Sequence, residues 1–262
     1  MNGRNLETEL AFAHRLADAA GAAILPHFRN NTDVENKAGT GFDPVTIADR
    51  AAEQAIRDLI AAERPGDGIL GEEFPVLPSR NGWSWTLDPI DGTRGFIAGT
   101  PTWCVLIALT FDGEPVLGVI DQPHTKERFS GFGGSADLSV NGQKSLLRTS
   151  GIPSLDSAIL ATTDPYLFRD NERDAFGKIR SKVRLTRYGM DAYAYALLAA
   201  GGIDLVVESG LNLYDLHALV PVVRAAGGVI TNWQGNDDFT TGQLVAAANS
   251  SLHAETLALL VS

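Results

Sequence analysis

The stretch DPIDGTRGF, residues Asp88–Phe96, places two aspartates close together around a proline. The proline holds Asp88 in an extended conformation and fixes the direction of the chain. In that conformation Asp88, the carbonyl oxygen of Ile90 and Asp91 can point toward one centre. Oxygen ligands suit a hard cation, Mg²⁺ or Mn²⁺, rather than zinc. The first half of the stretch therefore predicts a metal site.

The second half of the stretch opens into glycine and threonine. Gly92 allows the backbone to come close to a ligand, and the amides of Thr93 and Arg94 can form a helix N-terminus that binds an anion. Thr93 also carries a hydroxyl that can orient a water molecule. Close carboxylates repel each other, and two divalent cations about 3.5–4 Å apart, as in two-metal phosphatases, would remove that repulsion. The turn therefore predicts a phosphate site beside the metals.

The composition is that of an ordinary globular protein, with 262 residues of which 44% are hydrophobic and 20% charged. A net charge of -11 argues against nucleic acid as a partner, since such an interface needs a basic face. The N-terminus does not resemble a signal peptide and no apolar run is long enough for a bilayer, so we expect no membrane partner and a cytoplasmic location. The single cysteine, Cys104, cannot form an intramolecular disulfide and is interpreted as a small buried hydrophobe.

Hydrophobic periodicity predicts two N-terminal helices, over 6–28 and 44–62, the second with its proline at the helix start. Short β-rich runs follow, with a hairpin turn at Asp112-Gly113, and after about residue 145 strands and helices alternate. We therefore expect layered sheets and helices, divided into an α+β half over 1–145 and an α/β half over 146–262. The predicted strands are GILGEE, SWTLD, WCVLIALTF, PVLGVIDQ, SAILAT, KVRLTR, IDLVVES, VITNW and QLVAAAN, and the later helices are 171–180, 191–201, 216–228 with a kink at Pro221, and 252–260.

Acidic residues stand at the ends of several predicted elements. Taken singly, each is more often a solvated loop acid or a helix cap than a functional group. Their shared placement favours one site, because binding residues gather where strand ends meet loops. These residues are Asp49, Glu72, Glu73, Asp88, Asp91 and Asp215.

Three motifs in this order resemble the inositol monophosphatase family of metal-dependent, lithium-sensitive phosphatases. They are GEE at Gly71–Glu73, DPIDGT at Asp88–Thr93 and YDLHALVPVVRAAGG at Tyr214–Gly228, and the resemblance extends over nearly the whole chain. It implies an αβαβα layered sandwich of the inositol monophosphatase and fructose-1,6-bisphosphatase type. It also implies two or three Mg²⁺ ions per subunit, a small phosphomonoester as substrate, and a homodimer.

The resemblance also implies which residues bind the metals. Glu72, Asp88 and the Ile90 carbonyl correspond to the ligands of one Mg²⁺, and Asp88, Asp91 and Asp215 to the ligands of a second.

Other positions of the family motifs imply supporting roles. Asp49 and Thr93 correspond to the pair that positions the attacking water, and the Gly92 and Thr93 amides to the phosphate-binding turn. Glu73 corresponds to a supporting acid, and Lys37 to a loop position near the metals.

The chain departs from the family pattern around the last metal ligand. Tyr214 stands where the family often has tryptophan, and it keeps the aromatic packing, so metal binding should survive. We interpret His217, on the same helix turn, as a packed or half-exposed side chain with a lesser prospect of contacting substrate.

Details of the sequence are similar to the histidinol-phosphatase branch of the family, which acts in histidine biosynthesis. These are the arginine at position 94, LGVIDQPHTKERFSG, and YGMDAYAYALLAAGGIDLVVES. Asp191 and Glu208 are candidate contacts for the non-phosphate end of the substrate, and Arg94 borders the turn. Histidinol phosphate carries an ammonium and an imidazole, so an acidic pocket suits it. An N-cap role for Asp191 and an exposed strand-end position for Glu208 are the structural alternatives.

Three other functions compete with this interpretation. An inositol-1-phosphate or broad-range sugar monophosphatase would share every metal residue and differ only in the pocket. A phosphatase for 3′-phosphoadenosine nucleotides is expected to differ around the pocket. A non-catalytic binding protein of the same fold is disfavoured, because each expected metal-binding and water-positioning residue is present.

Overall fold

A seven-stranded sheet forms the first half of the fold. The computed structural model describes residues 3–30, 34–36 and 44–260. Strands β3 (Gly68–Gly71) and β4 (Trp83–Asp91) pair in parallel, and the remaining neighbours pair antiparallel in the order β3-β4-β5-β6-β7-β8-β9. The later strands are β5 (Cys104–Phe111), β6 (Glu114–Gln122), β7 (Glu127–Phe132), β8 (Ser135–Val140) and β9 (Gln143–Leu146).

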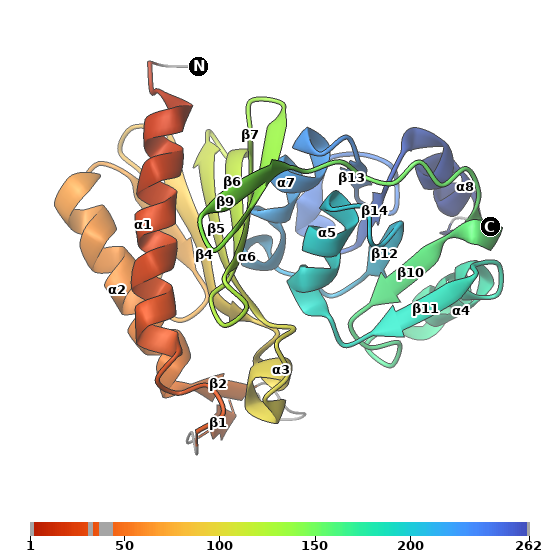
Figure 1. Ribbon diagram of the computed structural model, residues 1–262, viewed down its shortest axis with the longest axis horizontal. Helices are drawn as coiled ribbons and strands as arrows, with labels where there is room; N and C mark the ends of the chain where they lie inside the picture. Colours follow the sequence, from red (N-terminus) through yellow and green to blue (C-terminus); the bar gives the residue numbers. More distant parts are fainter. Residues whose placement is uncertain (1–2, 31–33, 37–43, 261–262) are drawn as a thin grey trace.

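A second, five-stranded sheet follows, in the order β11-β10-β12-β14-β13. Strand β10 pairs in parallel with β11 and β12, whereas β14 pairs antiparallel with β12 and β13. Its strands are β10 (Ile159–Thr162), β11 (Leu185–Tyr188), β12 (Leu205–Glu208), β13 (Val229–Thr231) and β14 (Leu244–Ala247). A separate pair, β1 (Val34–Asn36) and β2 (Pro44–Thr46), lies beyond the C-terminal end of the first helix (Figure 1).

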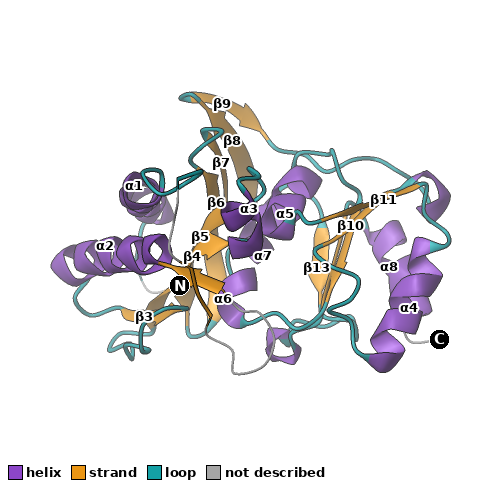
Figure 2. Ribbon diagram, turned by 90° about the horizontal axis from the view of Figure 1, so that it is seen from below, coloured by secondary structure: helices purple, strands orange, loops and turns teal. Residues whose placement is uncertain are grey.

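Helices separate and cover the two sheets, as Figures 1 and 2 show. Helices α1 (Leu6–Ile24) and α2 (Ile47–Glu63) cover the outer face of the first sheet, and α4 (Asp170–Arg180) and α8 (Ser250–Leu260) cover the outer face of the second. Between the sheets lie α5 (Asp191–Ala199), α6 (Leu213–Leu216) and α7 (Leu219–Ala225). The short helix α3 (Thr93–Ala98) follows β4, and 3₁₀ turns occur at Leu155–Ser157 and Phe239–Thr241. The predicted αβαβα layering is confirmed.

The apolar core follows these layers. One cluster of buried side chains packs α1 and α2 against the first sheet, with Phe12 edge-on to Trp85 at 5.3 Å between ring centroids. The central cluster joins α5 and α7 to both sheets. Gly118 and Gly131 lie directly under the α7 segment, and a Cβ at either position would clash with its backbone. The first sheet can therefore hold the helix that follows Asp215 closely against its inner face.

Several sequence predictions change in detail. The hairpin at Asp112-Gly113 is confirmed, and Cys104 is fully buried in β5. The first helix ends at Ile24 rather than Phe28. Pro44 lies in β2 and not at a helix start, because Thr46 caps α2.

The helix expected after Tyr214 is divided. Helix α6 ends at Leu216 and α7 begins at Leu219, so the helix is broken before Pro221 rather than kinked at it. The reason is that a proline in a helix has no N–H for the carbonyl four residues earlier, here that of His217. Strands β7, β8 and β9 were not among the predicted strands, since their sequences contain many polar residues and no clear apolar alternation.

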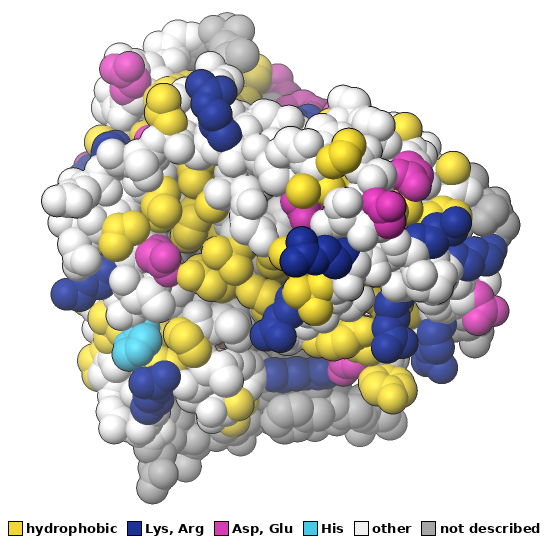
Figure 3. Space-filling model, turned by 45° about the vertical axis from the view of Figure 1, so that its right-hand side comes forward, with side chains coloured by type: hydrophobic (Ala, Val, Ile, Leu, Met, Phe, Trp, Pro, Cys, Tyr) yellow, Lys and Arg dark blue, Asp and Glu magenta, His cyan; other side chains and the backbone are white. Residues whose placement is uncertain are grey.

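Basic side chains concentrate on one side of this acidic protein. Residues 169–187, spanning α4 and β11, carry seven of the 21 lysines and arginines. Figure 3 shows Lys and Arg side chains over the half of the molecule where these elements lie. Strand β11 is an edge strand, and charged side chains discourage an exposed edge from pairing with another chain.

Candidate active site

An irregularity in β4 brings its two aspartates to the same side. Strand β4 pairs regularly with β5 up to Asp88, opposite Leu106, and the next pair is Asp91 opposite Cys104. Two residues of β4 thus lie opposite one residue of β5. In a regular strand, residues three apart face opposite sides, and the extra residue of a bulge cancels that alternation. Proline at position 89 suits the bulge because it has no N–H to donate to the ladder.

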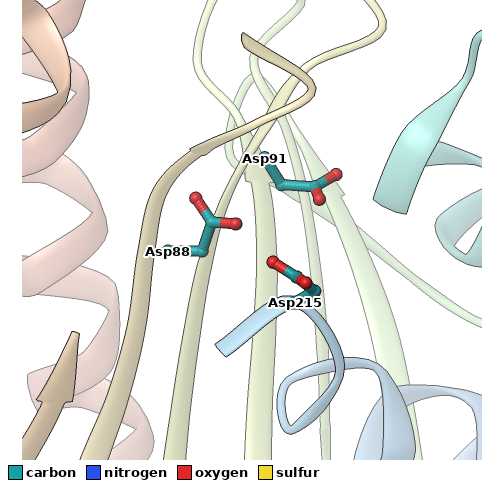
Figure 4. A group of neighbouring side chains, drawn as sticks. All are labelled: Asp88, Asp91 and Asp215. Atoms are coloured by element: carbon teal, nitrogen blue, oxygen red, sulfur yellow. The ribbon is translucent and has the colours of Figure 1, made fainter. Parts of the chain in front are cut away.

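Asp215 completes a cluster of three carboxylates. Figure 4 shows Asp88 and Asp91 projecting from β4 toward Asp215, which comes from α6. One oxygen from each of the three lies within 4.8 Å of the others. Asp215 Oδ2 also accepts the Asn212 amide N–H at 2.6 Å, which closes the first turn of α6. Asp91 Oδ2 accepts the amide N–H of Ala192 at 2.5 Å, so both aspartates are fixed by backbone donors.

Burial and mutual repulsion raise the pKa values of this cluster. Burial, followed by the charges of Glu72, Asp91 and Asp215, raises the pKa of Asp88 well above its usual range. Burial also raises the pKa of Asp91 well above its usual range. It raises the pKa of Asp215 to about 7, although the Asn212 amide works in the opposite direction. A bound cation would relieve this accumulation of negative charge, so the donor set fits a hard metal ion.

A buried carboxylate shapes the GEE loop that carries Glu72. Glu53 Oε2 on α2 accepts the Glu73 amide N–H at 2.7 Å, and its Oε1 accepts from Arg57 Nε at 2.7 Å. A Cβ on Gly71 would lie 2.0 Å from Glu53 Oε1, which explains why glycine is required there. Glu53 therefore supports Glu72 from behind, a contribution that the sequence prediction missed.

The turn after β4 has the geometry expected of a backbone anion site. Gly92 has φ +84, a left-handed conformation that suits glycine, and it precedes the first helical residue, Thr93. The Thr93 hydroxyl donates to the Ile90 carbonyl at 3.0 Å, which leaves its oxygen lone pairs available to accept from water. Asp191 lies against Gly92, 3.2 Å from where a Cβ would stand, and has φ +47.

The other end of the site is also acidic. Glu208 is buried at the end of β12, and its Oε1 accepts from Thr163 N at 2.8 Å and Thr163 Oγ1 at 2.6 Å. Burial raises the pKa of Glu208, and burial followed by the Glu208 charge raises the pKa of Asp191 to about 7. Glu208 is not the exposed strand-end acid of the structural alternative. Asp191 is the first residue of α5 and not its N-cap, which is Met190.

One cavity of about 330 Å³ joins the two ends. Eleven of the residues singled out from the sequence line it: Glu72, Asp88, Ile90, Asp91, Gly92, Thr93, Arg94, Asp191, Glu208, Tyr214 and Asp215. Arg94 Nη1 lies 3.8 Å from Asp164 Oδ2, and both side chains are in contact with solvent. The guanidinium is therefore accessible to a molecule in the cavity.

The other predicted residues lie elsewhere. Asp49 is 1% exposed, does not line the cavity, and accepts from Thr46 N at 2.8 Å and Thr46 Oγ1 at 2.6 Å. Its charge still contributes to the raised pKa of Asp88. Glu73 stands 3.9 Å from Arg50 and also lies outside the cavity lining. Lys37 lies outside the described residues.

His217 is a packed side chain, as its sequence position suggested. It is 7% exposed and its Nδ1 lies 3.0 Å from Thr86 Oγ1 of β4. Burial lowers its pKa to about 4, so the ring is neutral at physiological pH.

Two loop segments of the cavity lining were missed by the sequence prediction. The segment 162–168 contributes Thr162, Thr163, Asp164, Leu167 and Phe168, and the segment 209–212 contributes Ser209, Gly210, Leu211 and Asn212. No hydrophobic period marks them, and their mixture of polar residues, glycine, proline and isolated apolar residues is that of any loop. Only their tertiary contacts reveal them.

The arrangement points to a class of protein, because a layered α+β fold with a carboxylate cluster beside a glycine turn at a helix start is what a metal-dependent phosphatase requires. A model of the inositol monophosphatase family matches residues 5–262. The chain belongs to this family, whose members are phosphatases that depend on metal ions, usually Mg²⁺. None of the helices in the described ranges has the length and apolar character needed to cross a bilayer.

Individual relatives carry different names. The chain is 41% identical to the bifunctional phosphatase IMPL2, chloroplastic, of Arabidopsis thaliana, over 98% of this chain and 76% of that protein. It is 38% identical to a histidinol-phosphatase of Mycobacterium tuberculosis, over 96% of this chain and 97% of that protein. A solved structure of an inositol monophosphatase from Zymomonas mobilis has a TM-score of 0.86 and 44% identity, over 99% of this chain and 100% of that one.

Proposed function

We propose that this protein is a Mg²⁺-dependent phosphomonoester hydrolase whose preferred substrate is histidinol phosphate. The observation that carries the proposal is one cavity with the Asp88, Asp91 and Asp215 carboxylates at one end and Glu208 at the other, and with Asp191 between them. The first end suits a metal-bound phosphate, and the second suits a cationic organic group. The similarity to a histidinol-phosphatase over 96% of the chain supports the same choice.

The carboxylates of the first end would hold two or three metal ions. Glu72, Asp88 and the Ile90 carbonyl would hold one, and Asp88, Asp91 and Asp215 a second. When bound, Mg²⁺ supplies positive charge at the phosphoryl group and makes water a better nucleophile. Mn²⁺ would suit the same oxygen donors.

The protein's own groups would place the water and the phosphate. The Thr93 hydroxyl gives its proton to the Ile90 carbonyl and can accept a hydrogen bond from the attacking water. Asp49, fixed at the start of α2, would support this water position as the negative partner of the pair. The amides after Gly92 would bind the phosphate oxygens, because helix N-terminal amides lack partners within the helix. An in-line displacement by the water would then release the alcohol and phosphate.

The acidic end would select the substrate's organic part. Histidinol phosphate brings an ammonium, and Asp191, whose pKa burial raises to about 7, would be held in its charged form by such a cation. Glu208 accepts two hydrogen bonds from Thr163 through Oε1, and among the described residues Oε2 accepts one long bond, of 3.4 Å, from Tyr195. Oε2 can therefore accept from the substrate. A charge-assisted hydrogen bond is worth roughly 1.5–3 kcal/mol, which is about ten- to over a hundredfold in kcat/KM.

A phosphate-release panel with Mg²⁺ tests the proposal. It should contain histidinol phosphate, inositol 1-phosphate, fructose 1,6-bisphosphate and 3′-phosphoadenosine 5′-phosphate. We expect histidinol phosphate to be preferred over inositol 1-phosphate by at least about tenfold, the lower end of the range for one charged hydrogen bond. Asp191→Asn and Glu208→Gln should reduce that preference, mainly by raising KM for the cationic substrate. Equal turnover of both substrates, or an unchanged ratio in both variants, contradicts the choice of substrate.

The second candidate is an inositol-1-phosphate or broad-range sugar monophosphatase. The 44% identity to the Zymomonas mobilis inositol monophosphatase favours it, and hydroxyl groups of a polyol can also donate to Asp191 and Glu208. A non-catalytic binding protein is disfavoured, and phosphate release by the purified protein excludes it.

We also propose that the protein acts as a homodimer in the cytoplasm. Light scattering measures the molecular mass in solution and so tests the dimer. Fractionation of cells that express the native gene tests the cytoplasmic location. A monomer by mass at working concentration contradicts the first part of this proposal.

A further inference from the structure

One wall of the cavity is a loop, residues 163–169, between β10 and α4. Thr163, Asp164, Leu167 and Phe168 of this loop line the cavity. Two of its residues project into solvent, with Tyr166 82% exposed and Leu167 47% exposed. A loop with exposed apolar side chains holds its position only if its two ends are fixed.

Each end of the loop is fixed by a carboxylate, and the two connections end at neighbouring residues, Glu208 and Ser209. At the first end, Thr163 donates its amide N–H and its hydroxyl to Glu208. At the other end, Glu172 Oε2 accepts the Arg169 amide N–H at 3.0 Å, and Glu172 Oε1 accepts from Ser209 Oγ at 2.7 Å. The loop is thus tied to Glu208 at one end and to Ser209 at the other.

Glu172 also accepts a third hydrogen bond, from a residue just before another strand of the second sheet. Gln243 Nε2, just before β14, donates to Glu172 Oε1 at 2.8 Å. Strand β14 pairs with β12 there, with Leu244 opposite Glu208. One carboxylate therefore joins the start of α4 to the ends of both strands. Its partners, Ser209 and Gln243, are 37 and 71 residues away in the sequence.

Phe168 transmits this anchoring to the cavity. It lines the cavity, is 2% exposed, and stacks on Phe176 of α4 with 4.6 Å between ring centroids. Arg173, one residue after Glu172, donates to the Phe168 carbonyl at 3.1 Å. If the start of α4 shifted, Phe168 would shift with it.

We propose that Glu172 is a positioning residue: it fixes the 163–169 loop as a wall of the cavity and so sets how tightly the organic part of the substrate is bound. This inference rests on the proposed function, because it takes the cavity as a phosphomonoester site. Glu172 does not line the cavity, and it acts through Ser209 and Phe168. Phosphate binding at the Asp88 end should not depend on it.

The kinetic test compares Glu172→Ala with the wild-type protein and with Asp174→Asn, an exposed acid two residues along the same helix. In Glu172→Ala we expect KM for histidinol phosphate to rise at least fivefold, with kcat changed less than twofold. The inhibition constant of inorganic phosphate, which reports the metal end, should change less than twofold. Asp174→Asn should match the wild type in all three values.

Glu172→Gln and Gln243→Ala refine the test. A glutamine keeps one oxygen for Ser209 and Gln243 but turns an NH₂ group toward the Arg169 amide, so its KM should lie between wild type and Glu172→Ala. Gln243→Ala removes one of the hydrogen bonds to Glu172. Its effect on KM should disappear in the Glu172→Ala background, since both changes remove the same contact.

Hydrogen exchange supplies a readout that needs no activity. The amides of 163–169 should exchange at least tenfold faster in Glu172→Ala than in wild type or Asp174→Asn. An unchanged KM, or a phosphate inhibition constant that rises as much as KM, overturns the inference. If the wild-type protein releases phosphate from no phosphomonoester, the proposed function fails, and the exchange rates alone then decide whether Glu172 holds the loop.

Discussion

Replacing Asp215 by asparagine should stabilise the metal-free protein and abolish its activity. Burial raises the pKa of Asp215 from its usual 3.8 to about 7. The folded state therefore holds its proton more tightly than the unfolded state, and stability falls as pH rises from about 4 to 7. The difference of about three pKa units corresponds to about 4 kcal/mol at 1.36 kcal/mol per unit. Because Asp215 is partly accessible to water, we expect about half of this, or about 2 kcal/mol.

Asparagine keeps the local structure that this estimate requires. Its side-chain oxygen can still accept the Asn212 amide N–H, which Asp215 accepts at 2.6 Å. The measurement is thermal or urea unfolding in EDTA at pH 8 and pH 5. At pH 8 the melting temperature should rise by about 4–8 °C, at 2–4 °C per kcal/mol. At pH 5 the wild-type carboxyl is already mostly protonated, so the difference should shrink.

Activity supplies the second half of this prediction. With Mg²⁺ present, Asp215→Asn should lose at least about a hundredfold in kcat, the loss expected for a key electrostatic group. Asp174→Asn is the matched control and should change neither stability nor activity. A variant that is less stable than wild type in EDTA at pH 8 would refute the reasoning, because it would mean that the carboxylate is favourably solvated without a metal.

Three further predictions concern the groups around the metals. Thr93→Ala and Asp49→Asn should lower kcat strongly and leave Mg²⁺ affinity near normal, and calorimetry showing lost Mg²⁺ binding in both would place them among the ligands. Glu53→Gln should weaken Mg²⁺ binding, because Glu53 fixes the loop that carries Glu72. The loss of a buried charged hydrogen bond should cost about 2 kcal/mol or more of binding free energy, and an unchanged affinity would contradict this. Gly92→Ala should cost about 1–2 kcal/mol of stability through its left-handed backbone and should raise the inhibition constant of phosphate; if both values stay at wild type, the turn is not rigid.

The grouping of Asp88 and Asp91, which the structure shows, follows from the sequence for a physical reason. Asp88, Asp91 and the turn that follows lie within six residues, so local backbone rules alone bring their groups together. Even the detail that matters most, the bulge that turns both aspartates to one side, is centred on a proline visible in the sequence. Asp215 was found because a motif marks it.

Periodicity likewise predicts the long helices and the buried strands, whose apolar positions repeat strongly. It fails at the β7–β9 hairpins, where the strands are short, rich in polar residues and partly or fully exposed. It also fails to place the break between α6 and α7, which depends on a hydrogen bond that Pro221 cannot make.

The cavity wall shows why substrate choice is harder to predict than chemistry. Glu172 meets Ser209 and Gln243 only after the second sheet has formed, and nothing in the sequence marks these three polar residues as neighbours. Asp191 joins the two ends of the site, because its side chain lies against Gly92 while the next amide donates to Asp91. On the proposed function, a backbone shift at this junction would reach Asp91 as well as the organic part of the substrate, whereas a change at the wall would reach only the organic part. The contacts that would set substrate choice therefore depend on tertiary neighbours, whereas Asp88 and Asp91 are neighbours already in the sequence.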